Sequence, residues 1–194
     1  MNEILKRYGN LYEKICDLDN IKKAHKMARK DKTYYQEVQM VDKTPSYYCK
    51  QIQKMLLNHE YKIKPEDYTV KIINDKGKTR VLHKLSYYPH RIIQWAVMLQ
   101  IEQIFMKTFT SFTCASLPKR GIHKALFMLH NYLRDVEGTQ YCLKMDIHHF
   151  YPSVNHKILK SLLRKKFKDP ELLSLLDMII DSNDEGLPIG SYLS

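Results

Sequence analysis

The sequence predicts an α+β fold that is mostly helical and contains two strand regions. Apolar residues recur at helical spacing over most of the chain. The segment Tyr68–Ile73 is β-branched and aromatic, and a second short run, Gln140–Ile147, is largely apolar and carries an aspartate near its end. The composition is that of a globular protein, because 44% of the 194 residues are hydrophobic and 27% are charged.

The first 90 residues contain two predicted helices and a hairpin. Leu18–Lys30 has the pattern of a basic helix, and a second helix begins around Pro45, where apolar residues start to recur at helical spacing. Tyr68–Ile73 is followed by the turn residues Asn74–Gly77 and then by Arg80–Leu82, which returns as the second strand. The predicted hairpin therefore carries basic residues at its tip.

The rest of the chain alternates helices and breaks. Pro89 opens a long predicted helix, Arg91–Phe105, which is apolar on most sides and is therefore expected to be buried. A break at Pro118–Gly121 comes before the next helix. The remaining predicted helices, the last two with Asn155 and Asp169 as N-caps, are His123–Val136, Asn155–Phe167 and Pro170–Asp181.

The charge balance indicates the class of partner. The chain carries 32 Lys and Arg against 21 Asp and Glu, a formal net charge of +11, which favours nucleic acid over a membrane surface. No apolar run approaches the roughly 18 residues that span a bilayer. The four cysteines are far apart, which argues against a zinc ribbon or a disulfide framework. We therefore expect a cytoplasmic protein with no membrane partner.

Asp146 is the strongest candidate for chemistry. An aspartate that leaves a largely apolar strand is costly to bury unless a cation or a hydrogen-bond donor accompanies it. Mg²⁺ suits such a carboxylate, because it takes hard oxygen ligands and shares them with substrate phosphates. Another interpretation stays open, in which Asp146 caps the turn or pairs with Lys144 or a nearby histidine.

Two stretches of the sequence resemble motifs of reverse transcriptases. The run from Lys144 to His156, K-M-D-I-x-x-F-Y-P-S-V-N-H, resembles the motif that carries the first catalytic aspartate. Gly186–Ser194 resembles the downstream motif that contacts template and nucleotide. Arg80, Arg91 and the run Gly121–Ala125 stand in the order of the fingers motifs of that family.

The resemblance implies a right-hand polymerase architecture. Residues 1–60 would be a helical N-terminal extension, residues 61–138 the fingers region with a palm-packing helix at 91–105, and residues 139–194 the first half of the palm. Ile189-Gly190 stands where many relatives have Gln-Gly. In this respect the chain is most similar to the enzymes of diversity-generating retroelements and to related unassigned or antiviral-defence reverse transcriptases.

The same resemblance implies a metal site and a template site. Asp146 and the carbonyl of Ile147 would bind Mg²⁺, with Mn²⁺ as the other candidate, in a two-metal mechanism. The residues that would contact the RNA template and the DNA primer are Lys119, Arg120, Gly121, Pro188, Ile189, Gly190 and Ser191.

A nucleotide site is implied as well. Arg80 would clamp the incoming deoxynucleoside triphosphate, and Lys78 at the hairpin tip would replace a lysine that many relatives have at the position of Asn74. Tyr151 matches a steric gate that excludes a 2′-hydroxyl. Phe150 beside it either borders the nucleotide or packs in the core.

The N-terminal region carries a weaker prediction of RNA binding. Five cations lie close together on the predicted basic helix: Lys22, Lys23, Lys26, Arg29 and Lys30. Tyrosines follow them, which fits base stacking and core packing equally well: Tyr34, Tyr35, Tyr47 and Tyr48.

One absence shapes the expected activity. Reverse transcriptases have a Tyr-x-Asp-Asp motif downstream of the first aspartate, and this sequence contains no Asp-Asp pair. We therefore expect an inactive N-terminal part of an enzyme that extends a primer on an RNA template, with an accessory protein as a further candidate partner. The alternatives are a non-catalytic RNA- or DNA-binding module and a defence-associated polymerase that extends without a template.

Overall fold

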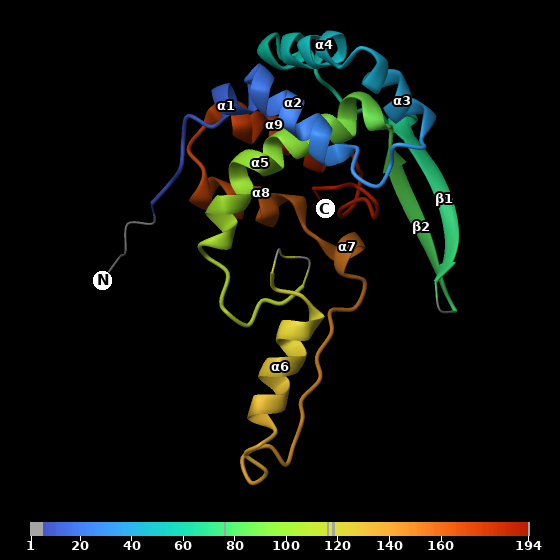
Figure 1. Ribbon diagram of the computed structural model, residues 1–194. Helices are drawn as coiled ribbons and strands as arrows, with labels where there is room; N and C mark the ends of the chain where they lie inside the picture. Colours follow the sequence, from blue (N-terminus) through green and yellow to red (C-terminus); the bar gives the residue numbers. More distant parts are fainter. Residues whose placement is uncertain (1–5, 76, 116, 118, 194) are drawn as a thin grey trace. The chain divides into compact units, whose positions relative to one another are not determined.

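The computed structural model describes residues 6–193 except 76, 116 and 118, and it confirms a mixed fold of helices and strands (Figure 1). The chain divides into two compact units, which are described separately below. One comprises Met1–Ile101 and His149–Ser194, and the other comprises Glu102–His148. No described helix is both long enough and apolar enough to cross a membrane.

Four helices begin the first unit: α1 (Tyr12–Cys16), α2 (Leu18–Ala28), α3 (Gln36–Lys43) and α4 (Pro45–Leu57). The side chain of Asp17 caps α2 by accepting hydrogen bonds from the backbone N–H groups of Asp19 and Asn20 at 2.9 and 3.0 Å. The predicted helices at Leu18 and Pro45 are thus confirmed. The short helices α1 and α3 were not predicted.

The predicted hairpin is also confirmed. Strand β1 (Tyr68–Asp75) pairs antiparallel with β2 (Lys78–Leu85), so that Tyr68 lies opposite Leu85 and Ile73 lies opposite Arg80. Gly77 in the turn has φ +80°, a conformation that favours glycine.

The long helix α5 (Ile92–Met106) supplies the core of this unit, as its apolar composition predicts. Ile92, Ile93 and Val97 are fully buried. Asn20 links α2 to α5, because its amide donates to the carbonyl of Ala96 at 3.1 Å. The starting end of α5, which carries the site residues below, is therefore held on a rigid base.

The C-terminal helices are α7 (Phe150–Ser153), α8 (His156–Lys166) and α9 (Pro170–Asp181). Both predicted caps are confirmed, since Asn155 accepts from the N–H of Ile158 at 3.1 Å and Asp169 accepts from the N–H of Leu172 at 3.2 Å. Asp169 also accepts from the N–H groups of Leu11 and Tyr12 at 2.7 and 3.0 Å. Burial alone would raise the pKa of Asp169, but these backbone donors hold it below its ordinary value.

The second unit contains helix α6 (Ile122–Tyr132), which begins one residue before the predicted start and ends four residues before the predicted end. Pro118 of the predicted break lies outside the described residues. The predicted strand Gln140–Ile147 is not formed: these residues have no regular secondary structure, and all of them are exposed. A strand needs a neighbour for its backbone groups, and the described residues contain no partner strand for this segment.

Candidate functional site

Three segments that the sequence analysis singled out meet in the first unit. The backbone N–H of His83 on β2 donates to the carbonyl of Ile189 at 2.8 Å, and the N–H of Leu187 donates to the carbonyl of Tyr151 at 2.9 Å. The loop Gly186–Ser191 is thus bonded on one side to the hairpin and on the other to α7. Backbone hydrogen bonds of this kind fix the loop without using its side chains.

Two glycines allow this close approach. Gly186 has φ +62°, and a Cβ there would lie 2.3 Å from the carbonyl oxygen of Tyr151 and 2.6 Å from the Cα of Pro152. Gly190 has φ +112°, and its Cβ would lie 3.2 Å from the carbonyl oxygen of His83. The loop can therefore contact both neighbours only because these positions lack a side chain.

Gln94 on α5 holds the end of the loop. Its amide donates to the hydroxyl of Ser191 at 3.0 Å, and its carbonyl oxygen accepts from the N–H of Tyr192 at 3.0 Å. The ring of Tyr192 stacks on Trp95 with 4.3 Å between centroids, and the guanidinium of Arg91 lies 5.4 Å from the same ring. The sequence analysis missed Gln94, although a polar residue inside an otherwise apolar helix is the pattern that could have revealed it.

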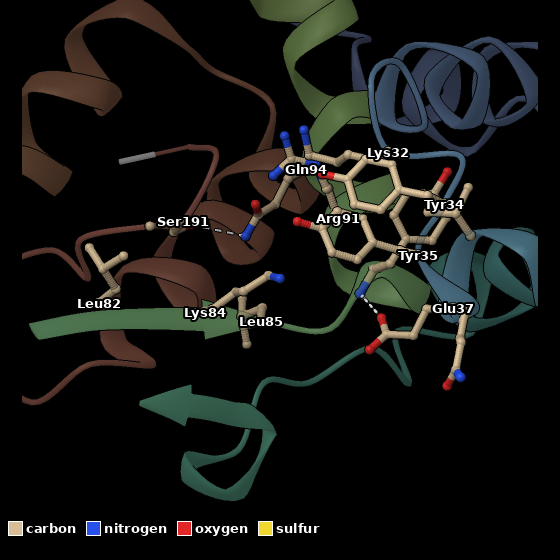
Figure 2. Close-up of a pocket in the computed structure, with 14 residues that line it drawn as sticks. Lys32, Tyr34, Tyr35, Glu37, Leu82, Lys84, Leu85, Arg91, Gln94 and Ser191 are labelled. Atoms are coloured by element: carbon tan, nitrogen blue, oxygen red, sulfur yellow. Dashed lines mark hydrogen bonds between the residues drawn. The ribbon is translucent and has the colours of Figure 1, made fainter. Parts of the chain in front are cut away.

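A cavity of about 550 Å³ opens beside the loop (Figure 2). Its walls come from the segment between α2 and α3, from β2, from the start of α5 and from the loop itself. The lining residues include Lys32, Tyr34, Tyr35, Lys84, Arg91 and Gly190.

A buried hydrogen-bonded chain supports the wall of this cavity. The Nδ1 atom of His25 lies 2.7 Å from the hydroxyl of Tyr87, and its Nε2 atom lies 3.0 Å from a carboxylate oxygen of Asp42. Burial lowers the pKa of His25, partly offset by Asp42, and burial raises the pKa of Tyr87. The three residues tie α2 and α3 to the segment that precedes α5.

The predicted nucleotide residues belong to β2 and to α7, and they differ in exposure. Arg80 is exposed on β2, and the side chain of Lys78 lies outside the described residues. Tyr151 is half-buried beside the loop, and the ring of Phe150 lies 5.3 Å from it in an edge-on arrangement, with 48% of Phe150 exposed. Phe150 is therefore too exposed to be a core residue.

The predicted template residues fall into two groups. Pro188 is buried, Ile189 and Ser191 are half-buried, and Gly190 is exposed at the cavity. The other three, Lys119, Arg120 and Gly121, belong to the second unit. There Gly121 precedes α6, and Arg120 donates to the carbonyl of Thr110 at 3.1 Å.

Asp146 and Ile147 also belong to the second unit, where both are exposed. No described residue forms an ion pair or a hydrogen bond with the Asp146 carboxylate, and the described residues contain no group of three or more metal-ligating side chains. Asp146 and Ile147 supply two oxygen ligands, so a Mg²⁺ ion held there would need waters, substrate phosphates or further carboxylates to complete its coordination.

The five cations of the predicted basic helix divide by their contacts. Arg29 donates to the carboxylate of Asp42 at 2.7 and 3.1 Å, and Lys22 pairs with Asp19 at 3.0 Å. Lys23, Lys26 and Lys30 are exposed. Internal pairing leaves fewer cations for a phosphate backbone than the sequence count suggests.

Comparison with known proteins yields one distant match. No protein-family model matches this chain. The chain is 25% identical over 137 residues to a curated protein, Protein YkfC of Escherichia coli strain K12, and the match covers 64% of this chain. It covers 36% of that protein, so the chain spans little more than a third of the length of the relative.

Proposed function

We propose that these 194 residues are the N-terminal part of a reverse transcriptase, comprising its fingers and the first half of its palm. The enzyme would add deoxynucleotides to a primer 3′ end on an RNA template. The observation that carries the proposal is the bonding of the Gly186–Ser191 loop to both β2 and Tyr151. These segments are distant in sequence, and the resemblance gives each of them a role toward nucleotide or template.

The geometry suits a nucleotide at this place. Arg80 is exposed on a strand, and the planar fork of a guanidinium fits phosphate oxygens. The backbone of Tyr151 is held by the hydrogen bond from Leu187 to its carbonyl, and its half-buried ring contacts Phe150. A sugar that rests on a fixed ring is sensitive to an added 2′-hydroxyl, which supports selection of deoxynucleotides.

The segment around Asp146 supports a palm that extends beyond the described residues. Its apolar side chains alternate along the chain and are largely exposed: Tyr141 94%, Leu143 81%, Met145 81% and Ile147 63%. Alternation is typical of a strand with one buried face. We propose that this segment pairs with further strands, which also bring the additional carboxylates that a divalent-metal site requires.

A second candidate function is a non-catalytic module that binds RNA or DNA. The net charge of +11 and the absence of a metal-ligating group among the described residues favour it. The two candidates differ in one respect, because only the polymerase incorporates nucleotides.

Primer extension by the natural gene product that contains these residues tests the proposal. Tyr151→Ala is expected to admit ribonucleotides that the wild type rejects, and Arg80→Ala is expected to raise the KM for every deoxynucleotide. Lys71→Ala, an exposed cation on the neighbouring strand β1, is the matched control and should leave the KM unchanged. A wild-type product that binds RNA but incorporates nothing would contradict the proposal and favour the binding module.

A further inference from the structure

The cavity beside the loop has one wall to which the resemblance assigns no role. Lys32, Tyr34 and Tyr35 belong to the connection between α2 and α3, inside the N-terminal 60 residues that the reverse-transcriptase motifs do not reach. Lys84 on β2 and Gly190 line the same cavity. The cavity therefore combines a segment of unassigned function with the candidate template loop.

Two tyrosines form an aromatic platform at this wall. The rings of Tyr34 and Tyr35 lie 4.5 Å apart between centroids with 32° between their planes, and they lie side by side in Figure 2. Tyr34 is 70% exposed and Tyr35 is 40% exposed, so neither ring is committed to the core. Exposed aromatic rings at a cavity mouth are suited to stacking on an unpaired base.

Positive charge surrounds the platform. The ammonium of Lys84 lies 4.9 Å from the centre of the Tyr35 ring, and Lys32 and Arg91 line the same cavity. The Nε atom of Arg91 is buried and has no hydrogen-bond partner among the described residues. The hydrogen bond with Tyr34 and the charge of Lys84 lower the pKa of the Tyr35 phenol.

Glu37 is the one acidic residue among those that line this cavity, and its carboxylate already accepts a backbone hydrogen bond. A carboxylate oxygen of Glu37 accepts the backbone N–H of Tyr87 at 2.5 Å (Figure 2). Three cations against this one carboxylate leave an excess positive charge, so an anionic ligand is favoured over a neutral or cationic one. Leu82 and Leu85 add apolar surface, which suits the ring of a base more than a free inorganic anion.

We propose that this cavity binds one nucleotide of a single-stranded RNA, with its base stacked on Tyr34 and Tyr35 and its phosphate held by Lys84 and Arg91. The identification of the strand as RNA rests on the proposed function, whereas the binding itself requires neither Asp146 nor a metal ion. A paired base cannot enter, because stacking on the platform requires an unstacked ring. The site would hold the strand beside the Gly186–Ser191 loop.

Fluorescence anisotropy with a labelled 12-residue oligouridylate in EDTA tests the site separately from catalysis. Replacing both tyrosines, Tyr34→Ala with Tyr35→Ala, is expected to weaken binding by about tenfold or more. The corresponding Phe variants should bind like the wild type, because they keep the rings. Tyr132→Ala, a 56% exposed tyrosine of α6 that does not line the cavity, is the matched control and should leave affinity within about twofold.

Charge and covalent mapping provide independent readouts. Lys84→Ala should reduce the slope of log affinity against log salt by about 0.7, the value for one phosphate contact on a single strand. Lys54→Ala, an exposed lysine of α4 that does not line the cavity, is the matched control and should leave the slope unchanged. Ultraviolet cross-linking of 4-thiouridine RNA to the unmodified protein should label the peptide that contains Tyr34 and Tyr35.

Three results would overturn the proposal: unchanged affinity in the double tyrosine variant, cross-links confined to other peptides, or binding of uridine monophosphate as tight as that of the oligomer. The last result would identify a site for free nucleotides. A wild-type protein that binds RNA at this site but extends no primer would refute the proposed polymerase function and leave the binding site standing. Failure of the two proposals can therefore be distinguished.

Discussion

Replacing Gly186 by alanine is expected to detach the loop that links β2 to α7. The added Cβ would meet backbone atoms, the carbonyl oxygen of Tyr151 at 2.3 Å and the Cα of Pro152 at 2.6 Å, and no side-chain rotation can relieve such a collision. Relief requires movement that breaks the bond from Leu187 to Tyr151 at 2.9 Å and the contact between His156 and the Gly186 carbonyl at 2.6 Å.

The expected loss of unfolding free energy is the sum of the backbone strain and the two lost hydrogen bonds. The left-handed backbone at φ +62° costs alanine about 1 kcal/mol, and each lost hydrogen bond costs about 1 kcal/mol. The total is about 3 kcal/mol of unfolding free energy. Gly77→Ala is the matched control, because Gly77 also has a positive φ but no atom within 4 Å of its Cβ, so that only the backbone cost of about 1 kcal/mol remains.

Urea unfolding followed by tryptophan fluorescence measures the difference. Trp95 is the single tryptophan, and its stacking on Tyr192 makes its emission a reporter of the attached C-terminal segment. Gly186→Ala should lower the unfolding free energy by about 2 kcal/mol more than Gly77→Ala does and should alter Trp95 emission before unfolding begins. Equal losses in the two variants, with unchanged native emission, would refute the steric reasoning.

Two further predictions concern stability. Burial lowers the pKa values of His25 and His90 below 6.5. As the pH falls through that value, the unfolded chain therefore binds more protons than the folded one. The free energy of unfolding should thus decrease from pH 7.5 to pH 5.5. His25→Gln should reduce the difference between the urea midpoints at the two pH values. The exposed His130→Gln is the control and should leave that difference unchanged. Identical midpoints of the wild type at the two pH values would contradict the argument. Asp169→Ala leaves three backbone N–H groups without their acceptor. It should lower the free energy of unfolding, measured in urea, by about 3 kcal/mol. Asp169→Asn keeps one acceptor oxygen and should lower it by less. A loss no larger than that of the exposed Asp184→Ala would show that these bonds do not stabilise the fold.

Local sequence patterns were sufficient for the hairpin and for most of the long helices. The caps at Asn155 and Asp169, the turn at Gly77 and the apolar composition of α5 each depend on residues close in sequence. The short helix α3 escaped prediction because eight residues are too few for a helical periodicity to stand out in the sequence. Contacts distant in sequence hold it in place, such as the one from Asp42 to His25.

Distant pairing could not be predicted in the same way. The segment Gln140–Ile147 has the composition of a strand, but strand formation depends on a partner that the sequence of the segment does not specify. The roles of Gln94 and Gly190 likewise depend on the approach of a loop almost one hundred residues away from Gln94. The motifs drew attention to the loop, whereas the cavity beside it became apparent only from the arrangement of β2, α5 and the segment before α3.

Primer extension with Asp146→Ala in the natural gene product tests the central claim most directly. Glu137→Ala is the matched control, because Glu137 is also exposed and lies in the same unit of the chain. The account predicts that Asp146→Ala lowers deoxynucleotide incorporation by at least about 100-fold, with RNA binding retained, and that Glu137→Ala leaves incorporation unchanged. Equal incorporation by the wild type and Asp146→Ala would contradict the assignment of this chain to a reverse transcriptase.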